Sequence, residues 1–133
     1  MINHDFGKLI LRVCVGGLML FHGIFKLQYG IDGVTGLLES RGLPTFMAYG
    51  VYVGEILAPL LILIGYQVRL AALVEIFTML IAIYSVFGFS IFSLDNTGGW
   101  VIEHQLLYIL PCLAPFFMGG GRYGIHIFLK KSY

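Results

Sequence analysis

The sequence predicts an all-α integral membrane protein, a four-helix transmembrane bundle with short loops, and three observations support this. Of the 133 residues, 59% are hydrophobic and only 11% are charged, with a mean hydropathy of +0.91, whereas an ordinary soluble domain is about 25% charged. A soluble chain this short could not bury so much apolar surface in one core. The apolar residues fall in four runs, each close to the roughly 20 residues that a helix needs to cross a bilayer.

We place the four spans at about residues 6–28, 46–65, 69–88 and 101–118, within a single domain covering residues 1–133. The loop between the second and third spans is only Tyr66–Val68, which makes these two spans antiparallel neighbours. Residues 34–39, after the first span, are expected to form a short helix on the membrane surface. The net charge of +1 gives no indication of a nucleic-acid partner.

Basic residues predict the orientation. The N-terminus, the second loop and the C-terminus share most of them: Lys8, Arg12, Arg69, Arg122, Lys130 and Lys131. The other two loops and their flanks hold only Lys26 and Arg41. The positive-inside rule therefore places both termini in the cytoplasm, and we expect a multi-pass protein of the bacterial inner (plasma) membrane.

Ionisable residues in or beside the spans are the candidates for function: Arg12, His22, Lys26, Glu55, Glu75, Glu103 and His104. A charged residue at a helix centre costs about 2.5–3.5 kcal/mol on insertion scales, so these residues should face the bundle interior and pair. Arg12 and Glu75 would both lie about 9 Å deep on the cytoplasmic side, which predicts an ion pair. This pair could serve structure alone.

A second cluster is expected near the outer end, from Lys26, Glu103 and His104, together with His22. Glu55 lies close to the midplane, where Arg12 from below or His22 from above must reach it. At 100° per residue, Arg12, His22 and Lys26 share one side of the first span. We expect Glu55 and His22 to exchange protons with a ligand.

Small and sulfur-containing residues complete the pattern. Gly50, Gly54 and Ala58 form a small-xxx-small face on the second span that permits close helix packing. Cys14 and Cys112 are far apart in sequence and form no CxxC motif, so we expect neither a metal site nor a thiol-exchange pair.

Several segments resemble the DoxX family. The first is LRVCVGGLMLFHGIFKL at residues 11–27, with its arginine, glycine, histidine-glycine pair and lysine. RGLP (41–44), VGEILAPLLILIGYQVRLAAL (53–73) and GGGRYGI (119–125) continue the match in order and spacing. The resemblance implies a four-helix membrane bundle with patterned positions at Arg12, Gly16, His22, Gly23, Lys26, Glu55, Gly65, Arg69 and Arg122. Family members include or resemble a subunit of a thiosulfate:quinone oxidoreductase, and others are described as membrane partners in oxidative-stress and thiol homeostasis.

Two functions fit these observations. The first is a quinone-linked redox or oxidative-stress component, in which a quinone binds between the helices and a soluble or membrane redox subunit supplies electrons. Lys26 or Arg12 would then stabilise a reduced anion. The alternative is a non-enzymatic lipid-binding or membrane-protein assembly module. A homo-oligomer is compatible with either function, and a transporter is less favoured because no inverted repeat is evident.

Overall fold

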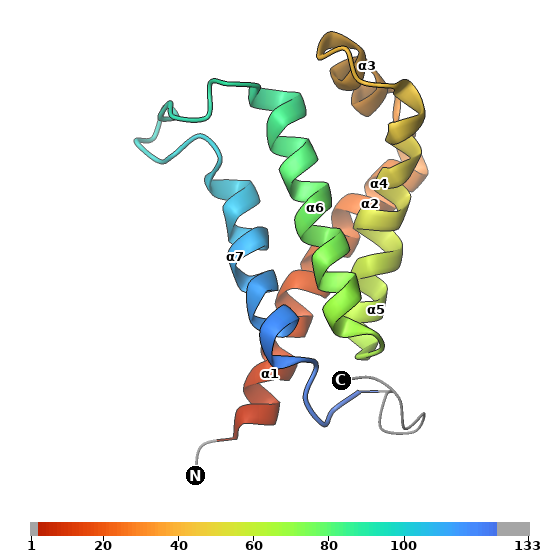
Figure 1. Cartoon of the computed structure of the whole chain (residues 1–133), viewed down its shortest axis with the longest axis vertical. Helices are drawn as coiled ribbons and strands as arrows, with labels where there is room; N and C mark the ends of the chain where they lie inside the picture. The colour runs from red at the N-terminus through yellow and green to blue at the C-terminus, as the bar shows by residue number, and fades with distance from the viewer. Residues whose placement is uncertain (1–2, 125–133) are drawn as a thin grey trace.

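The computed structural model describes residues 3–124, which form a bundle of four long helical segments (Figure 1). The first segment joins α1 (His4–Arg12), a π-helical turn η1 (Val13–Gly17) and α2 (Leu18–Tyr29). The second joins a 3-10 turn η2 (Thr45–Tyr49), α4 (Gly50–Tyr52), a π-helical turn η3 (Val53–Leu57) and α5 (Ala58–Ile64). The third and fourth are α6 (Val68–Phe87) and α7 (Glu103–Met118), and a short α3 (Asp32–Ser40) follows the first segment.

Three of the four segments are long and apolar enough to cross a membrane: His4–Tyr29, Thr45–Ile64 and Val68–Phe87. Their ends agree with the predicted spans to within two residues, and the predicted all-α membrane bundle is confirmed. The fourth segment is shorter than predicted, because α7 has 16 residues and is therefore about 24 Å long. Its start is delayed by the preceding loop, where the Val101 amide donates to the Ser93 carbonyl rather than starting the helix.

The connections decide which helices are neighbours. Between α5 and α6 the chain turns within three residues, with positive φ at Gly65 (82°) and Gln67 (50°). The two helices therefore lie antiparallel and side by side, as predicted, and α6 then packs most extensively against α7. The short helix predicted at residues 34–39 is present as α3, at the far end of the bundle from α1 (Figure 1).

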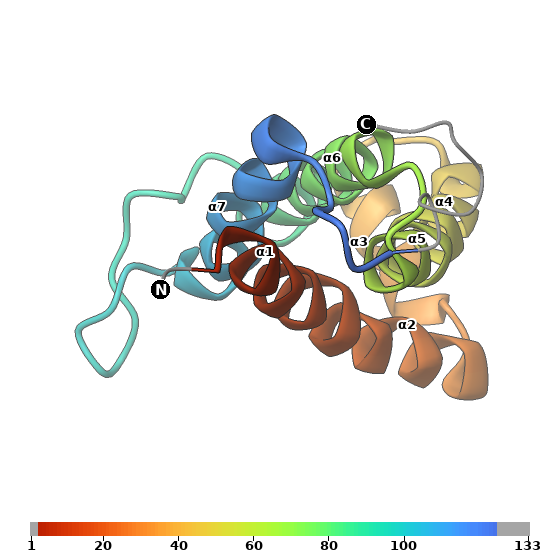
Figure 2. The ribbon, with the colours of Figure 1, turned by 90° about the horizontal axis from the view of Figure 1, so that it is seen from below.

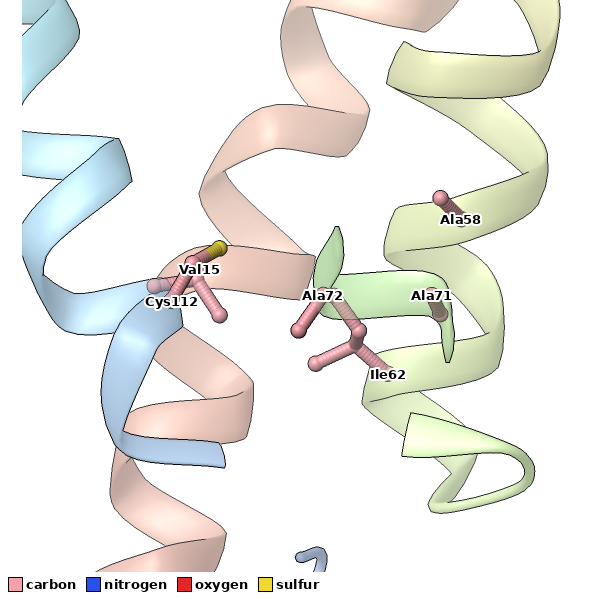
Figure 3. Packing of buried hydrophobic residues seen from close by; sticks show 6 residues of the cluster. All are labelled: Val15, Ala58, Ile62, Ala71, Ala72 and Cys112. Carbon is pink, nitrogen blue, oxygen red and sulfur yellow. The ribbon is translucent and has the colours of Figure 1, made fainter. Parts of the chain in front are cut away.

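The core is built mainly from small side chains, so the helix backbones approach closely. One cluster joins all four segments: Val15, Ala58, Ile62, Ala71, Ala72 and Cys112 (Figure 3). A Cβ on Gly23 would lie 2.2 Å from the Glu55 carbonyl oxygen, and one on Gly54 would lie 1.9 Å from Thr78 Oγ1. Gly54 and Ala58 thus use the predicted small-residue face, whereas Gly50 is exposed.

Arg12 stabilises the end of the bundle where the described chain starts and finishes. Its Nε donates to the Ile62 carbonyl (2.9 Å) and its Nη2 to the Leu63 carbonyl (2.8 Å). These carbonyls belong to the last turn of α5, where helical N–H partners run out and positive charge is favoured. Nη1 donates to the carbonyls of Gly120 (3.1 Å) and Tyr123. The predicted Arg12–Glu75 ion pair is therefore wrong, because backbone carbonyls occupy the guanidinium.

Both described ends of the chain lie at this same end of the bundle. The Arg122 amide donates to Asp5 Oδ1 over 3.2 Å, and Figure 2, seen from below, shows α1 close to the segment that follows α7. The loop between α6 and α7 projects away from the helices in both views. Lys130 and Lys131, which contributed to the predicted orientation, lie outside the described residues.

Candidate ligand-binding groove

A hollow of about 1190 Å³ opens between the first segment, α3, the upper half of the second segment, α6 and α7. Its wall is largely apolar, with Met19, Phe25 and Phe77 among the lining residues. The polar side chains that line it are His22, Lys26, Tyr29, Asp32, Glu55, Thr78, Ser85, His104, Gln105 and Tyr108. We call this hollow the groove. Because its wall is largely apolar but carries these polar side chains, the groove offers an apolar molecule both a matching surface and several hydrogen-bonding groups.

An ion pair crosses the groove between the first and second segments. Lys26 Nζ donates to Glu55 Oε2 at 2.5 Å. The Glu55 side chain is only 6% exposed and that of Lys26 is 26% exposed. The long lysine stem lets the ammonium reach down to the carboxylate from a position nearer the helix end. The prediction that Arg12 or His22 must partner Glu55 is therefore corrected: Lys26 is the partner.

Local backbone geometry places Glu55 opposite Lys26. Glu55 lies in the π-helical turn η3, and its carbonyl oxygen packs directly against Gly23 of α2. Lys26 follows Gly23 by three residues, so it is on the same face of α2. Single π-turns inside α-helices are frequently found at functional sites. The glycine contact thus brings α2 close enough for the ion pair to form.

Three rings lie next to the ion pair. The centroid of the His22 ring is 5.4 Å from that of His104 and 5.8 Å from that of Tyr108. The His104 and Tyr108 rings are 5.5 Å apart, and all three pairs meet edge to face, a favourable arrangement for aromatic rings. Two imidazoles and a phenol hydroxyl thus offer groups that can donate or accept protons beside Lys26.

Two polar atoms of the groove lack a hydrogen-bond partner among the described residues. These are Ser85 Oγ and Gln105 Oε1, and both are buried. Buried polar atoms are normally hydrogen-bonded, so an unpaired one calls for an explanation. A polar group of a bound molecule, or ordered water, would satisfy them.

The structure brings together four of the seven residues singled out from the sequence: His22, Lys26, Glu55 and His104. The other three lie elsewhere. Arg12 binds the carbonyls described above, and Glu75 is buried in the core behind the groove. Glu103 is exposed and lines a separate hollow of about 450 Å³ with Trp100 and Leu107. The predicted outer cluster is thus divided, with Lys26 and His104 in the groove and Glu103 outside it.

A π-turn explains why Arg12 separates from the other residues of its helix. The prediction that Arg12, His22 and Lys26 share one side assumed a regular α-helix. The turn η1 between Arg12 and His22 is π-helical, and its wider turn rotates the following residues relative to an α-helix. His22 and Lys26 consequently line the groove, whereas Arg12 does not.

The remaining polar groove residues were not predicted as site residues from the sequence. Thr78 and Ser85 belong to a visible stripe of small and polar residues along the third span, which is the signal that could have identified them. Tyr108 follows His104 by four residues on the same helical face. Gln105 gives no comparable signal, because its role depends on the packing of α7 against α6.

Within residues 3–124 no group of three or more His, Cys, Asp or Glu side chains could hold a metal ion. The polar groups of this otherwise apolar groove are instead an ion pair, three rings and two unpaired polar atoms. Chemically, it can bind an amphiphilic molecule, orient its polar part and exchange protons with it.

Fold and groove together define a small helical membrane protein with a polar site between its helices. The chain belongs to the DoxX family, whose model matches residues 7–88, and these residues contain the ion pair and most of the groove. It is 34% identical over 84 residues to the Bacillus subtilis (strain 168) protein named "Putative oxidoreductase CatD". That alignment covers 63% of this chain and 62% of the relative. No solved structure matches the chain.

Proposed function

We propose that this protein is the membrane component of a quinone-linked redox system and that its groove binds the quinone. The Lys26–Glu55 ion pair inside a largely apolar groove is the observation that carries the proposal. A quinone has a flat polar ring and an apolar tail, and this combination fits the groove's division into polar and apolar surfaces. The name of the Bacillus subtilis relative, which includes the word oxidoreductase, agrees with a redox role.

Two unpaired polar atoms of the groove support a quinone ring as the ligand. Ser85 Oγ and Gln105 Oε1 are buried and unpaired. The Ser85 hydroxyl can donate a hydrogen bond to a ring oxygen of the quinone, and Gln105 Oε1 can accept one from a hydroxyl of the reduced quinol. A quinone supplies two-electron, two-proton redox chemistry when bound. The chain itself supplies binding, orientation and proton exchange.

The ion pair and the rings would perform distinct tasks. The Lys26 ammonium places positive charge where negative charge develops during reduction, and Glu55 holds that ammonium in position. His22 and Tyr108 can hold or pass protons beside it. Because the described residues offer no metal cluster and the sequence shows no flavin or haem motif, we propose that electrons come from a soluble or membrane partner subunit.

We also propose a location and an orientation. The location is the bacterial inner membrane, and the basic residues of the sequence favour an orientation with both termini in the cytoplasm. The contact between Arg122 and Asp5 supports an even number of crossings, because it places the two described ends at one end of the bundle.

Co-purification tests the proposal. The protein is purified in mild detergent beside a matched control membrane protein, and organic extracts of both are compared by mass spectrometry. We expect the protein extract to contain at least severalfold more quinone than the control extract. The Gln105→Leu variant should carry less bound quinone than the unchanged protein. Glu103→Gln is the matched variant, since Glu103 is a polar residue of the same helix outside the groove, and it should retain the quinone. Equal quinone in the protein and the control would contradict the proposal.

A second function has support from the groove's size. At about 1190 Å³ it is larger than the usual ligand pocket of about 300–1,000 Å³, and its wall is mostly apolar. A phospholipid would also fit, with its head group at the Lys26–Glu55 pair. Enriched phospholipid without quinone in the same extracts would favour a lipid-binding or assembly module.

A further inference from the structure

The short helix α3 covers one end of the groove. Leu37 and Leu38 of α3 line the groove, and Leu38 is buried. Arg41, which follows α3, ties this helix to the end of α6: its Nε donates to the Ser85 carbonyl and its Nη2 to the Val86 carbonyl, each over 3.3 Å. These carbonyls belong to the last turn of α6, where helical N–H partners run out and positive charge is favoured. The end of the groove beside α3 is therefore covered by a helix that is bonded in place.

The groove also reaches the outer surface of the bundle, along the line where η3 meets α6. The helix α6 packs against α5 and η3 and then leans away from α4 (Figure 1). Val53 of η3 and Leu73 and Phe77 of α6 line the groove and are also exposed on the outside of the bundle. Because both segments are long and apolar enough to cross a membrane, these exposed side chains face lipid. Lipid therefore meets the groove at this edge, which we call the seam (Val53, Leu73 and Phe77).

Polar groups that could hold a quinone ring lie at other positions of the groove. His22 lines it from α2, and His104 lines it from α7. The unpaired Ser85 Oγ belongs to the part of α6 that is nearest α3. Ser85 follows Phe77 by eight residues, which is about 12 Å along the helix. A ring held at these polar groups would therefore direct an attached apolar tail along the seam toward lipid.

We propose that the groove takes a long-tailed quinone dissolved in the bilayer, which enters sideways at the seam and leaves its tail there; this rests on the proposed quinone site. The tail then passes from lipid to apolar side chains without exposure to water, so its transfer carries no hydrophobic cost. The α3 helix, held by Arg41, separates the bound ring from that end of the bundle. A quinone without a tail would make no contact with the seam, so the seam selects for ligands that reside in the membrane.

Photolabelling tests this proposal with the full chain in lipid nanodiscs. The probe is a naphthoquinone whose isoprenoid tail carries a diazirine, which bonds to neighbouring atoms on illumination. Labelled residues are identified by peptide mass spectrometry, with and without an excess of the same quinone lacking the diazirine. Labelling that this excess suppresses reports a specifically bound quinone, and its position reports where the tail lies.

We expect suppressible labelling at the seam, on the peptides that carry Val53, Leu73 and Phe77. Val53→Trp should reduce the labelling of the α6 peptide severalfold, because the larger side chain fills the space that the tail occupies. Leu57→Trp is the matched control and should leave the labelling unchanged. Leu57 belongs to the same π-helical turn and is 50% exposed, against 47% for Val53, but it lies outside the groove lining.

Three outcomes overturn the proposal, and they can be told apart. Suppressible labelling confined to α3, or to α2 and α7, would leave the quinone site standing and show that the tail takes another route. Equal labelling of α6 in the two tryptophan variants would show that the tail does not pass Val53. Labelling that excess quinone nowhere suppresses would remove the quinone site itself, and the role of the seam with it. The first and last outcomes need only the unchanged protein, so the test holds even where Val53→Trp does not fold.

Discussion

Removing the Lys26 ammonium should destabilise the protein through Glu55. In Lys26→Met the apolar stem is largely kept, but the Glu55 carboxylate, whose side chain is 6% exposed, loses the single ion-pair partner that the described residues provide. Breaking a buried ion pair by removing one partner costs about 3–5 kcal/mol. Because the Lys26 side chain is 26% exposed, solvent screens part of this interaction. We therefore expect the free energy of unfolding to fall by an amount near the lower limit, about 3 kcal/mol, which is roughly a hundredfold in the folding equilibrium.

Removing the charge of Glu55 should lower the free energy of unfolding by less than removing that of Lys26. In Glu55→Gln the lysine keeps its flexible stem and can extend its ammonium toward the interface, so we expect about 1 kcal/mol, the value of a typical hydrogen bond. The double variant should then cost about 2 kcal/mol less than the sum of the two single changes, within the range measured for residues in contact.

The assay is reversible unfolding of the purified protein in mixed micelles, followed by the loss of helical circular dichroism as denaturing detergent increases. Glu103→Gln provides the control for changing an exposed acid, and it should alter the free energy of unfolding by less than about 0.5 kcal/mol. Additive effects of the two single changes would refute the reasoning, because they would show that Lys26 and Glu55 do not stabilise each other.

Three further predictions concern packing, capping and pH. Gly23→Ala should cost about 1–3 kcal/mol through overpacking, since its Cβ would lie 2.2 Å from a carbonyl oxygen, whereas Gly17→Ala, with nothing nearer than 3.9 Å, should cost little. Arg12→Lys should cost about 2 kcal/mol or more, because an ammonium cannot satisfy the same buried carbonyls and an unsatisfied one costs about 1–3 kcal/mol; the same unfolding assay measures both. Hydrogen bonds from the following residues of its loop lower the pKa of Asp95, so its contribution to loop stability is present above the ordinary value of about 3.9 and is lost as pH falls through the lowered pKa. The fluorescence of Trp100, which is the chain's single tryptophan, should therefore stay constant from pH 7 to about 4 and change below it, and in Asp95→Asn this low-pH change should disappear.

Each of these predictions has a result that contradicts it. Equal stability of the two glycine variants would show that the helices can separate at no cost. A fully stable Arg12→Lys protein would mean that the guanidinium bonds do not hold α5 and the segment after α7. A tryptophan signal that changes near pH 6 would assign the loop's pH dependence to a group other than Asp95.

Several features of the molecule were readable from the sequence because they depend on local physics. The length of each apolar run predicted the helices, and three of them meet the requirements of a membrane span. The short turn after Ile64 predicted antiparallel neighbours, since three residues cannot reach any other helix. The cost of charge in a bilayer singled out seven ionisable residues, and His22, Lys26, Glu55 and His104 do line one groove.

Which of these residues meet was decided by tertiary structure alone. Depth estimates paired Arg12 with Glu75, yet the Arg12 guanidinium binds the carbonyls at the end of α5, because a helix end offers several unpaired acceptors at once. Long side chains also reach across several ångströms, so Lys26 bonds Glu55 from a different depth. The π-turn η1, which no periodicity argument anticipates, turns Arg12 away from the groove. The sequence alone therefore determined which polar groups must enter the bundle. Their partners depended on backbone turns and side-chain reach, which act only once the helices are packed together.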